Sequence, residues 1–202
     1  MEKFKTLTAI AAPMDEANID TDQICPARFI KTLTTPNNDK ALFHDRRFAD
    51  DGAPKPDFIL NDADYADAQI IVAERNFGVG SSRQAAVFAL QAAGIRAVIA
   101  ESFGDIFYNN ALKAGLLTVR LDPGETKALR DSLPSHNGSP CVIDLAGQAI
   151  TGPDGRSYDF EIGALRKRCL LEGLDDLTLT EGYLPKIESF EENYRAARPW
   201  LF

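Results

Sequence analysis

The chain has 202 residues, of which 45% are hydrophobic and 26% charged, so it has the composition of a globular protein with a substantial core rather than of a disordered chain. Its formal net charge of −8 argues against nucleic acid as the main ligand, because nucleic acids bind to basic surfaces. No apolar run is long enough for a membrane span, we expect no signal peptide, and three widely spaced cysteines indicate a reducing, cytoplasmic location.

The first 121 residues carry the clearest secondary-structure pattern. We expect a first strand at residues 5–11, a turn-rich stretch at 18–29 and an irregular segment at 31–57. Short apolar runs then alternate with helical segments, in the order strand 69–73, helix 81–94, strand 96–100, helix 102–115 and strand 116–121. Each helix begins at a residue type that favours an N-cap and ends at a glycine: Ser81 or Ser82 and Gly94 for the first, Ser102 and Gly115 for the second. Strand–helix–strand units with short connections predict an α/β fold with a mostly parallel central sheet and flanking helices.

The rest of the chain predicts smaller elements added to that sheet. A short helix follows Gly124, and strands around 141–145 and 156–162, with a Pro-Asp-Gly turn between them, predict an appended antiparallel β-hairpin. Helices are expected at 163–172 and within 175–196. No linker divides the chain, so residues 1–202 are predicted to form a single domain with a C-terminal helical extension. Apolar residues near the C-terminus either dock the tail onto the chain's own core, which is the commoner role, or contact a partner: Tyr183, Leu184, Trp200, Leu201 and Phe202.

The best candidate for chemistry is the segment 78–83 (GVGSSR), which joins a buried strand to a helix. Ligands of open α/β sheets bind at the carboxyl ends of the strands, where the helix N-termini point free N–H groups outward. Two glycines let the backbone approach a ligand closely. Arg83 offers a planar fork to a carboxylate or phosphate, and its positive charge at a helix N-terminus favours an anion between them. The alternative is a plain glycine turn with a serine cap and a solvated arginine.

Other common motifs do not fit. A dinucleotide fingerprint needs a third glycine where Arg83 stands, a Walker loop needs Gly-Lys-Ser/Thr, and a nucleophile elbow needs a glycine two residues after its serine. The two histidines, His44 and His136, fall in irregular polar stretches where exposure is expected, so a serine–histidine triad has no support. No cysteine or histidine pair has metal-ligand spacing, so this chain alone is expected to bind neither zinc nor a cluster. The triplet 20–22 (DTD) is more typical of Asx caps and turns than of a cation site.

Three ordered segments resemble the signatures of one family. Residues 18–24 (NIDTDQI) with 26–29 (PARF), residues 76–83 (NFGVGSSR) and residues 102–110 (SFGDIFYNN) resemble, in order and spacing, the small subunits of 3-isopropylmalate dehydratase. That resemblance implies the swivelling-domain α/β fold of the aconitase superfamily. It also implies a hydro-lyase of leucine biosynthesis that acts on a small hydroxy-dicarboxylate and works only with a separate large subunit, which holds a 4Fe-4S cluster.

The resemblance also implies roles for residues of this chain. By motif position, Ser81 is the base that removes a carbon-bound proton, and Gly80, Ser82 and Arg83 bind the substrate, with Arg83 on a carboxylate. The stretch after the first signature is assigned to substrate specificity, with a mobile surface loop as the alternative; it comprises Arg28, Phe29, Ile30, Lys31 and Thr32.

One departure leaves the substrate open. Family members continue Ser-Ser-Arg with Glu-His-Ala, whereas this chain has Gln84, Ala85 and Ala86. A glutamine keeps the length of a glutamate but not its charge, and an alanine removes a ring. A related hydro-lyase acting on 2-methylmalate and citraconate, dimethylmalate or homoaconitate therefore remains an alternative. So does a non-catalytic, anion-binding regulatory module that keeps the fold.

Overall fold

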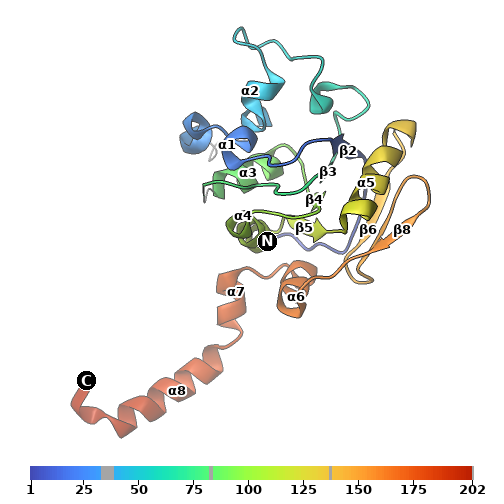
Figure 1. Ribbon diagram of the computed structural model, residues 1–202. Coiled ribbons are helices and arrows are strands. Elements are labelled where there is room, and N and C mark those ends of the chain that lie inside the picture. The colour runs from blue at the N-terminus through green and yellow to red at the C-terminus, as the bar shows by residue number, and fades with distance from the viewer. Residues whose placement is uncertain (33–38, 82–83, 137, 202) are drawn as a thin grey trace.

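The computed structural model describes residues 1–32, 39–81, 84–136 and 138–201, which contain two four-stranded sheets (Figure 1). The first is parallel, in the order β2 (Ala11–Met14), β3 (Ile70–Ala73), β4 (Ala97–Ala100) and β5 (Leu117–Arg120). The second is antiparallel, in the order β1 (Thr6–Ala9), β6 (Cys141–Asp144), β7 (Ala149–Thr151) and β8 (Ser157–Asp159). The predicted α/β class with a parallel central sheet is confirmed.

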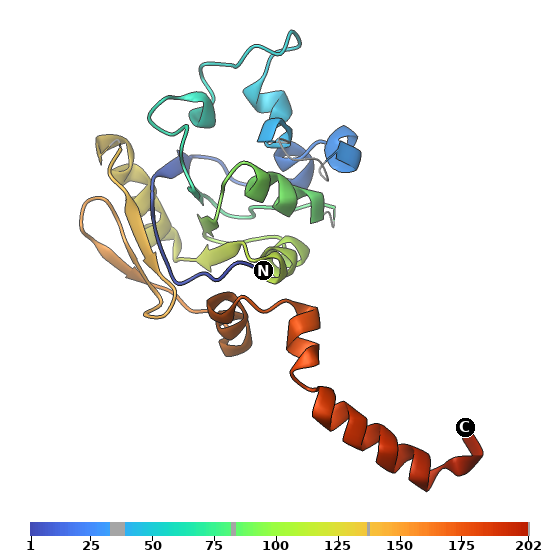
Figure 2. The same cartoon turned by 180° about the vertical axis from the view of Figure 1, so that it is seen from behind.

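The parallel sheet is covered on both faces. All residues of β3 and β4 are buried, and alternate side chains of each strand enter two different apolar clusters, as the period of two in a strand requires. On one face Ile71 and Val98 pack with Leu90 of α3 (Gln84–Ala92). On the other face Ile70 and Ile99 join a cluster supplied by α5 (Pro123–Ser132) and by the antiparallel sheet. The central strands lie between these layers (Figure 2).

The N-terminal segment joins the two sheets. Instead of one strand over 5–11 it forms two strands separated by Ile10, of which β1 pairs with β6 and β2 pairs with β3. The expected direct pairing of 141–145 with 156–162 is wrong, because β7 lies between them and pairs with both β6 and β8. The turn at 153–155 connects β7 to β8, with Gly155 at φ +80° and the Gly152 N–H donating to Arg156 O at 2.8 Å. The predicted hairpin is thus part of a larger antiparallel sheet.

The helices α3 and α4 (Asp105–Ala114) end near the glycines predicted to end them, but α4 does not begin at its predicted serine cap. Gly94 (φ +85°) lies just after α3, and Gly115 (φ +88°) caps α4. The expected N-cap at Ser102 is wrong, because the cap of α4 is Gly104 and the Ser102 hydroxyl instead accepts a hydrogen bond from the Asn76 N–H at 2.9 Å. The remaining short elements are α1 (Thr21–Ile24), α2 (His44–Arg47) and the 3₁₀ turns η1 (Ala27–Thr32), η2 (Asp39–Ala41), η3 (Ile59–Asn61) and η4 (Pro134–His136).

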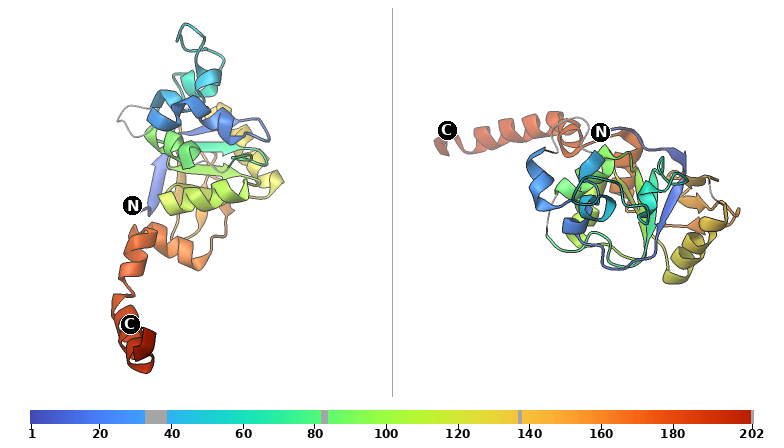
Figure 3. Two further views of the ribbon diagram at one scale, coloured as in Figure 1. Left: turned by 90° about the vertical axis from the view of Figure 1, so that its left-hand side faces the viewer. Right: turned by 90° about the horizontal axis from the view of Figure 1, so that it is seen from above.

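The C-terminal helices leave the body of the chain. After α6 (Ala164–Glu172), α7 (Asp176–Glu181) leads into α8 (Leu184–Ala197) and η5 (Pro199–Leu201), which project outward (Figure 3). The expectation that the tail docks on its own core is wrong for its described residues, since Phe190 is 65% exposed and Trp200 75% exposed. Phe202 lies outside the described residues. No helix of the described chain is long and apolar enough to cross a membrane.

Candidate functional site

Three segments far apart in the sequence meet at the carboxyl ends of β2, β3 and β4. They are residues 18–21, 76–81 and 102–104, and they contain parts of all three signatures identified in the sequence. Single parallel bridges extend the sheet across them, at Asp20 with Val79 and at Phe77 with Phe103. Four backbone hydrogen bonds of 2.7–3.0 Å join the segments: Thr21 N to Val79 O, Gly78 N to Ile19 O, Phe77 N to Ser102 O, and Gly104 N to Phe77 O. A fifth joins Asn18 N to the carbonyl of Arg75, just before the second segment, at 2.9 Å. The loop 76–81 is therefore held from both sides.

Two asparagines turn the chain at the edge of this site. Asn18 and Asn76 both have positive φ, at 60° and 59°, a backbone region in which asparagine is enriched among non-glycine residues. The Asn76 Nδ2 donates to Asn18 Oδ1 at 2.9 Å, so each side chain restrains the other's turn. Their backbones are also fixed by neighbours, because the Asn18 N–H donates to Arg75 O and the Asn76 N–H to Ser102 Oγ.

Glycines let the loop 76–81 lie directly on α4. Gly78 has φ +72°, and a Cβ at that position would lie 2.2 Å from Cγ of Phe107. A Cβ on Gly104 would lie 2.5 Å from the Gly78 carbonyl oxygen. Phe107 also packs edge-on against Phe77, with ring centroids 5.5 Å apart, and stacks on Phe103 at 6.3 Å. The two glycines and the phenylalanine cluster thus fix the distance between the loop and the helix.

Ser81, the predicted base, is exposed at the end of this loop. Its carbonyl accepts a hydrogen bond of 3.0 Å from the hydroxyl of Thr21, which is only 2% exposed. Gly80 precedes it with φ +102°, a conformation that suits glycine. The Ser81 Oγ has no hydrogen-bond partner among the described residues, so the Ser81 hydroxyl is available to a ligand while the Ser81 backbone is anchored. Ser82 and Arg83 lie outside the described residues.

Thr21 is a functional neighbour that sequence reasoning did not find. The Asp20 carboxylate caps α1 by accepting the Gln23 N–H at 2.7 Å, and the Gln23 side chain accepts the Asp20 N–H at 2.9 Å, which confirms the Asx-cap interpretation of 20–22. This capping box orients Thr21 toward the loop that carries Ser81. A Ser/Thr/Asp cap pattern identifies a helix start, but no local signal reveals a contact 60 residues away.

The stretch assigned to specificity lies beside the same helix. Arg28 and Phe29 belong to η1, which follows α1 after two residues, and α1, α2 and α3 form one group (Figure 1). The Arg28 Nη1 donates to Asp45 Oδ2 at 3.1 Å, and this hydrogen bond holds the pKa of the Asp45 carboxyl below its ordinary value. Ile30 is 42% exposed. Lys31 and Thr32 complete the turn η1.

Residues at the start of α3 carry the departure from the family pattern. Gln84 is exposed and Ala85 is buried in the cluster between α3 and the parallel sheet. The smaller side chain at position 85 therefore belongs to the core, and the glutamine faces outward near the end of the loop that carries Ser81.

The histidines and cysteines offer no rival chemistry. Both histidines are half-buried rather than exposed as expected. Each Nδ1 lies 2.8 Å from a carbonyl oxygen of its own turn, His44 at Lys40 O and His136 at Ser132 O. All three cysteines are buried and form no disulfide, and burial, with the negative charge of Asp154, raises the pKa of Cys141 to about 12. No group of three or more histidine, cysteine or acidic residues suited to a metal occurs in the described part of the chain.

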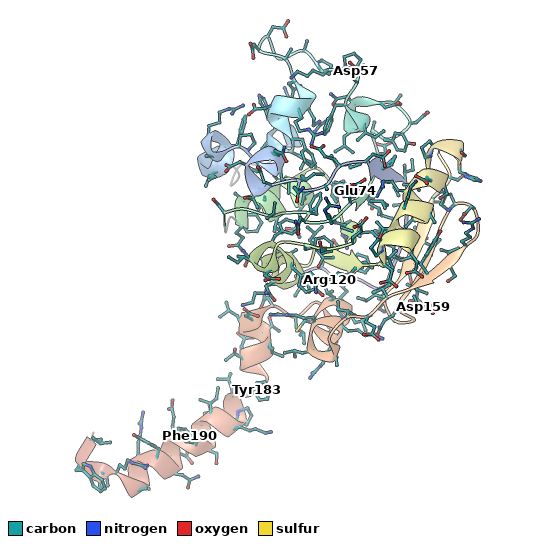
Figure 4. The ribbon with its side chains drawn as sticks, in the orientation of Figure 1. Asp57, Glu74, Arg120, Asp159, Tyr183 and Phe190 are labelled. Atoms are coloured by element: carbon teal, nitrogen blue, oxygen red, sulfur yellow. The ribbon has the colours of Figure 1, made fainter. Side chains whose placement is uncertain are left out.

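A cavity of about 900 Å³ lies between the end of β5 and the antiparallel sheet. Five carboxylates line it, together with Arg120, whose guanidinium lies 4.2 Å from the Tyr108 ring centroid (Figure 4). The carboxylates are Glu101, Asp122, Glu125, Asp159 and Glu161. Such a lining disfavours an anionic dicarboxylate, so this cavity does not compete with the loop at Ser81 as a substrate site.

A buried arginine fixes the strands that lead into the site. Arg130 of α5 is 5% exposed, and its guanidinium bonds Asp15, which follows β2, and Glu74, which follows β3, the latter at 3.2 Å. Its Nη1 is buried without a hydrogen-bond partner among the described residues. Glu74 precedes Arg75, whose carbonyl accepts from Asn18, so α5 braces the chain where it enters the loop 76–81.

Comparisons of the sequence and the fold with known proteins point to the family whose signatures meet at this site. A family model described as the aconitase C-terminal domain matches residues 1–124. The chain is 50% identical over 201 residues to the 3-isopropylmalate dehydratase small subunit of Jannaschia sp. (strain CCS1), covering 100% of both chains. It is 47% identical, again covering 100% of both, to the protein of that name from Afipia carboxidovorans. Among solved structures it resembles a 3-isopropylmalate dehydratase from Methanocaldococcus jannaschii, with a TM-score of 0.60 and 26% identity over 94% of this chain and 99% of the other.

Proposed function

Because the chain belongs to the aconitase C-terminal domain family and, within it, to the small subunits of 3-isopropylmalate dehydratase, we propose that it is the small subunit of a hydro-lyase that interconverts 2-isopropylmalate and 3-isopropylmalate. The reaction removes a hydroxyl and the proton of the neighbouring carbon as water, and returns water with the two positions exchanged. This places the chain in leucine biosynthesis. The observation that carries the proposal is the meeting of all three signature segments around the exposed Ser81.

Ser81 is the proposed base for the carbon-bound proton. A serine hydroxyl needs stabilisation of its alkoxide before it can act as a base, and no histidine contacts it among the described residues. The helix α3 starts three residues later, and the N–H groups at a helix N-terminus favour negative charge. Arg83 adds a positive charge two residues from Ser81 and is the proposed partner of a substrate carboxylate, with Gly80 and Ser82 beside it. Exclusion of water when the large subunit docks would strengthen each of these interactions.

The large subunit is the proposed partner and the proposed holder of a 4Fe-4S cluster. Bound there, the cluster supplies a Lewis acid for the leaving hydroxyl and a substrate carboxylate. This chain's own part is to hold the substrate and move one proton. The reaction is proposed to take place in the cytoplasm, a reducing compartment that suits three buried thiols that form no disulfide. Residues 1–202 are proposed to act as a single domain with a C-terminal helical extension.

The exposed helix α8 is the proposed contact for the large subunit. Among the described elements its 14 residues pack mainly on η5, and an isolated helix of that length is marginal in water. Leu184, Ile187, Phe190 and Tyr194 recur at intervals of three and four, so they share one face. Figure 4 labels Phe190 on this helix. Replacing Leu184 and Phe190 by serine should weaken capture of the large subunit, while Glu192→Ser on the opposite face should not. Unchanged capture, or a loss of self-association instead, would contradict this assignment.

A panel of substrates tests the proposed reaction. The chain is mixed anaerobically with the large subunit from the same organism, and the cluster is reconstituted. Dehydration is then followed for isopropylmalate, 2-methylmalate and dimethylmalate, and hydration for homoaconitate. The proposal expects the highest kcat/KM with isopropylmalate. The changed Gln84 and Ala85 favour a related malate as the second candidate, and activity confined to one of the other substrates would support that reading. A stable complex that acts on none of them would favour a regulatory module and refute the proposal.

A further inference from the structure

His44 contacts Phe29, within the stretch assigned to specificity, and Lys40, in η2. Its ring packs on Phe29, with centroids 4.5 Å apart, and its other neighbour is Phe48 at 5.3 Å. Its Nδ1 lies 2.8 Å from the Lys40 carbonyl oxygen. A carbonyl only accepts hydrogen bonds, so Nδ1 carries the proton in this contact. One half-buried side chain thus touches both η1, which contains the stretch, and η2.

The first turn of α2 holds two consecutive residues of η1. Asp45, next to His44, binds the guanidinium of Arg28 at 3.1 Å, and that guanidinium lies 4.9 Å from the ring centroid of Phe29. A cavity of about 330 Å³ adjoins these groups and is lined by Arg28, His44, Asp45 and Phe48 among others. Without the His44 ring, Phe29 would have open space to move into, because the ring fills the volume between Phe29 and Phe48.

The same helix α2 is tied to the frame that holds Ser81. The Phe43 N–H, just before His44, donates to Ile24 O at 2.8 Å at the end of α1. The other end of α1 donates from Thr21 Oγ1 to Ser81 O at 3.0 Å. Phe43 and Ile24 are both fully buried. A short series of buried contacts therefore runs from Ser81 through α1 to His44, and from His44 to Phe29.

We propose that His44 is a positioning residue for substrate selection, which sets where Arg28 and Phe29 lie relative to Ser81. It acts through the side chains of η1 and does not itself touch the substrate. The inference rests on the proposed function, and specifically on the assignment of η1 to the substrate's variable group. The ring contact with Phe29 carries the effect, and the bond to Lys40 O orients the ring.

Paired variants separate the two contacts. His44→Phe keeps a ring against Phe29 but has no donor for Lys40 O, whereas His44→Asn keeps a donor but has no ring. His136→Ala is the matched control, because His136 makes the same 2.8 Å contact with a carbonyl of its own turn, at Ser132, outside the site. The measured quantity is the ratio of kcat/KM for isopropylmalate to that for 2-methylmalate in the reconstituted complex. The two substrates differ in the size of the branching alkyl group.

The expected result is a fall of about tenfold in that ratio for His44→Asn and His44→Ala, the scale on which a pocket discriminates small alkyl groups. His44→Phe and His136→Ala should keep the ratio near that of the wild type. A role in stability alone would lower kcat/KM for both substrates equally and leave the ratio unchanged, and that outcome overturns the inference. Wild-type complex with no activity on either malate would instead refute the proposed function.

A second readout does not depend on activity. Trypsin cleaves after arginine only where the backbone can leave its folded conformation, so cleavage after Arg28 in the native chain reports how firmly η1 is held. His44→Ala should accelerate this cleavage several-fold relative to wild type and His136→Ala. An unchanged cleavage rate in His44→Ala and His44→Asn would overturn the inference even if the complex proves inactive.

Discussion

Replacing Gly78 by alanine perturbs the closest packing contact of the site. The residue has φ +72°, and an added Cβ would lie 2.2 Å from Phe107 Cγ and within 2.7 Å of both neighbouring ring carbons. The left-handed backbone costs an alanine about 1–2 kcal/mol. Forcing a methyl group into a packed ring costs about 1–3 kcal/mol more, because the ring or the loop must move. We therefore expect Gly78→Ala to lower the free energy of unfolding by about 2–5 kcal/mol.

A matched glycine separates these two contributions. Gly94 has φ +85° but nothing within 4 Å of its hypothetical Cβ, so Gly94→Ala should show only the backbone cost of about 1–2 kcal/mol. Trimming the ring in Gly78→Ala/Phe107→Leu should recover part of the loss, with a coupling of about 1 kcal/mol or more between the two changes. Urea unfolding with an unchanged slope measures each value. Equal losses at Gly78 and Gly94, with additive effects at Phe107, would refute the close-packing argument.

Three further predictions concern ionic and thiol groups. Arg130→Ala should lower the free energy of unfolding by about 2 kcal/mol, which is less than the loss of a fully buried pair because Glu74 is partly exposed. If Arg130→Met were as stable as the wild type, that result would contradict a role for the charge. Arg28 lowers the pKa of Asp45, so their ion pair holds above the ordinary Asp pKa and is lost as the pH falls through the lowered value. Arg28→Ala should raise the Asp45 pKa in an NMR titration, and no change would count against the pair. Because burial raises the pKa of Cys141 to about 12 and the other cysteines are buried, a thiol reagent at pH 8 should find no thiol in the native chain and three in urea.

The parallel sheet could be predicted because its signals are local. The runs at 69–73 and 96–100 are apolar throughout, which is typical of strands covered on both faces, and the glycines at 94 and 115 end their helices. The antiparallel sheet was only partly predicted. Its strand β7 has three residues and follows a polar turn, so its alternation is too short to recognise. No local pattern indicates that β1 leaves β2 to pair with β6, whose paired residues lie 132 to 138 positions away.

In the candidate site, too, the features with local signals could be predicted and those that depend on distant contacts could not. The exposed Ser81 and the glycines before it follow from the loop motif and the resemblance, whereas the Thr21 hydroxyl that anchors Ser81 depends on tertiary structure. His44 was expected to be exposed, because its neighbours in the sequence are polar. Its burial comes from Phe29 and Phe48, which lie on either side of it in space. The prediction that the tail docks on the chain's own core was wrong, because an apolar residue in a sequence carries no signal that distinguishes that core from a partner's surface.

The most direct test of the central claim is the turnover of Ser81→Ala in the cluster-loaded complex with the large subunit. Affinity for that subunit and thermal unfolding are measured on the same variant. Because Ser81 is exposed and its backbone contact to Thr21 is kept, stability and assembly should be unchanged, while kcat for isopropylmalate should fall about 10²–10⁴-fold, as for the loss of a general base. A variant that assembles normally and keeps kcat within about threefold of wild type would contradict the assignment of Ser81 as the base.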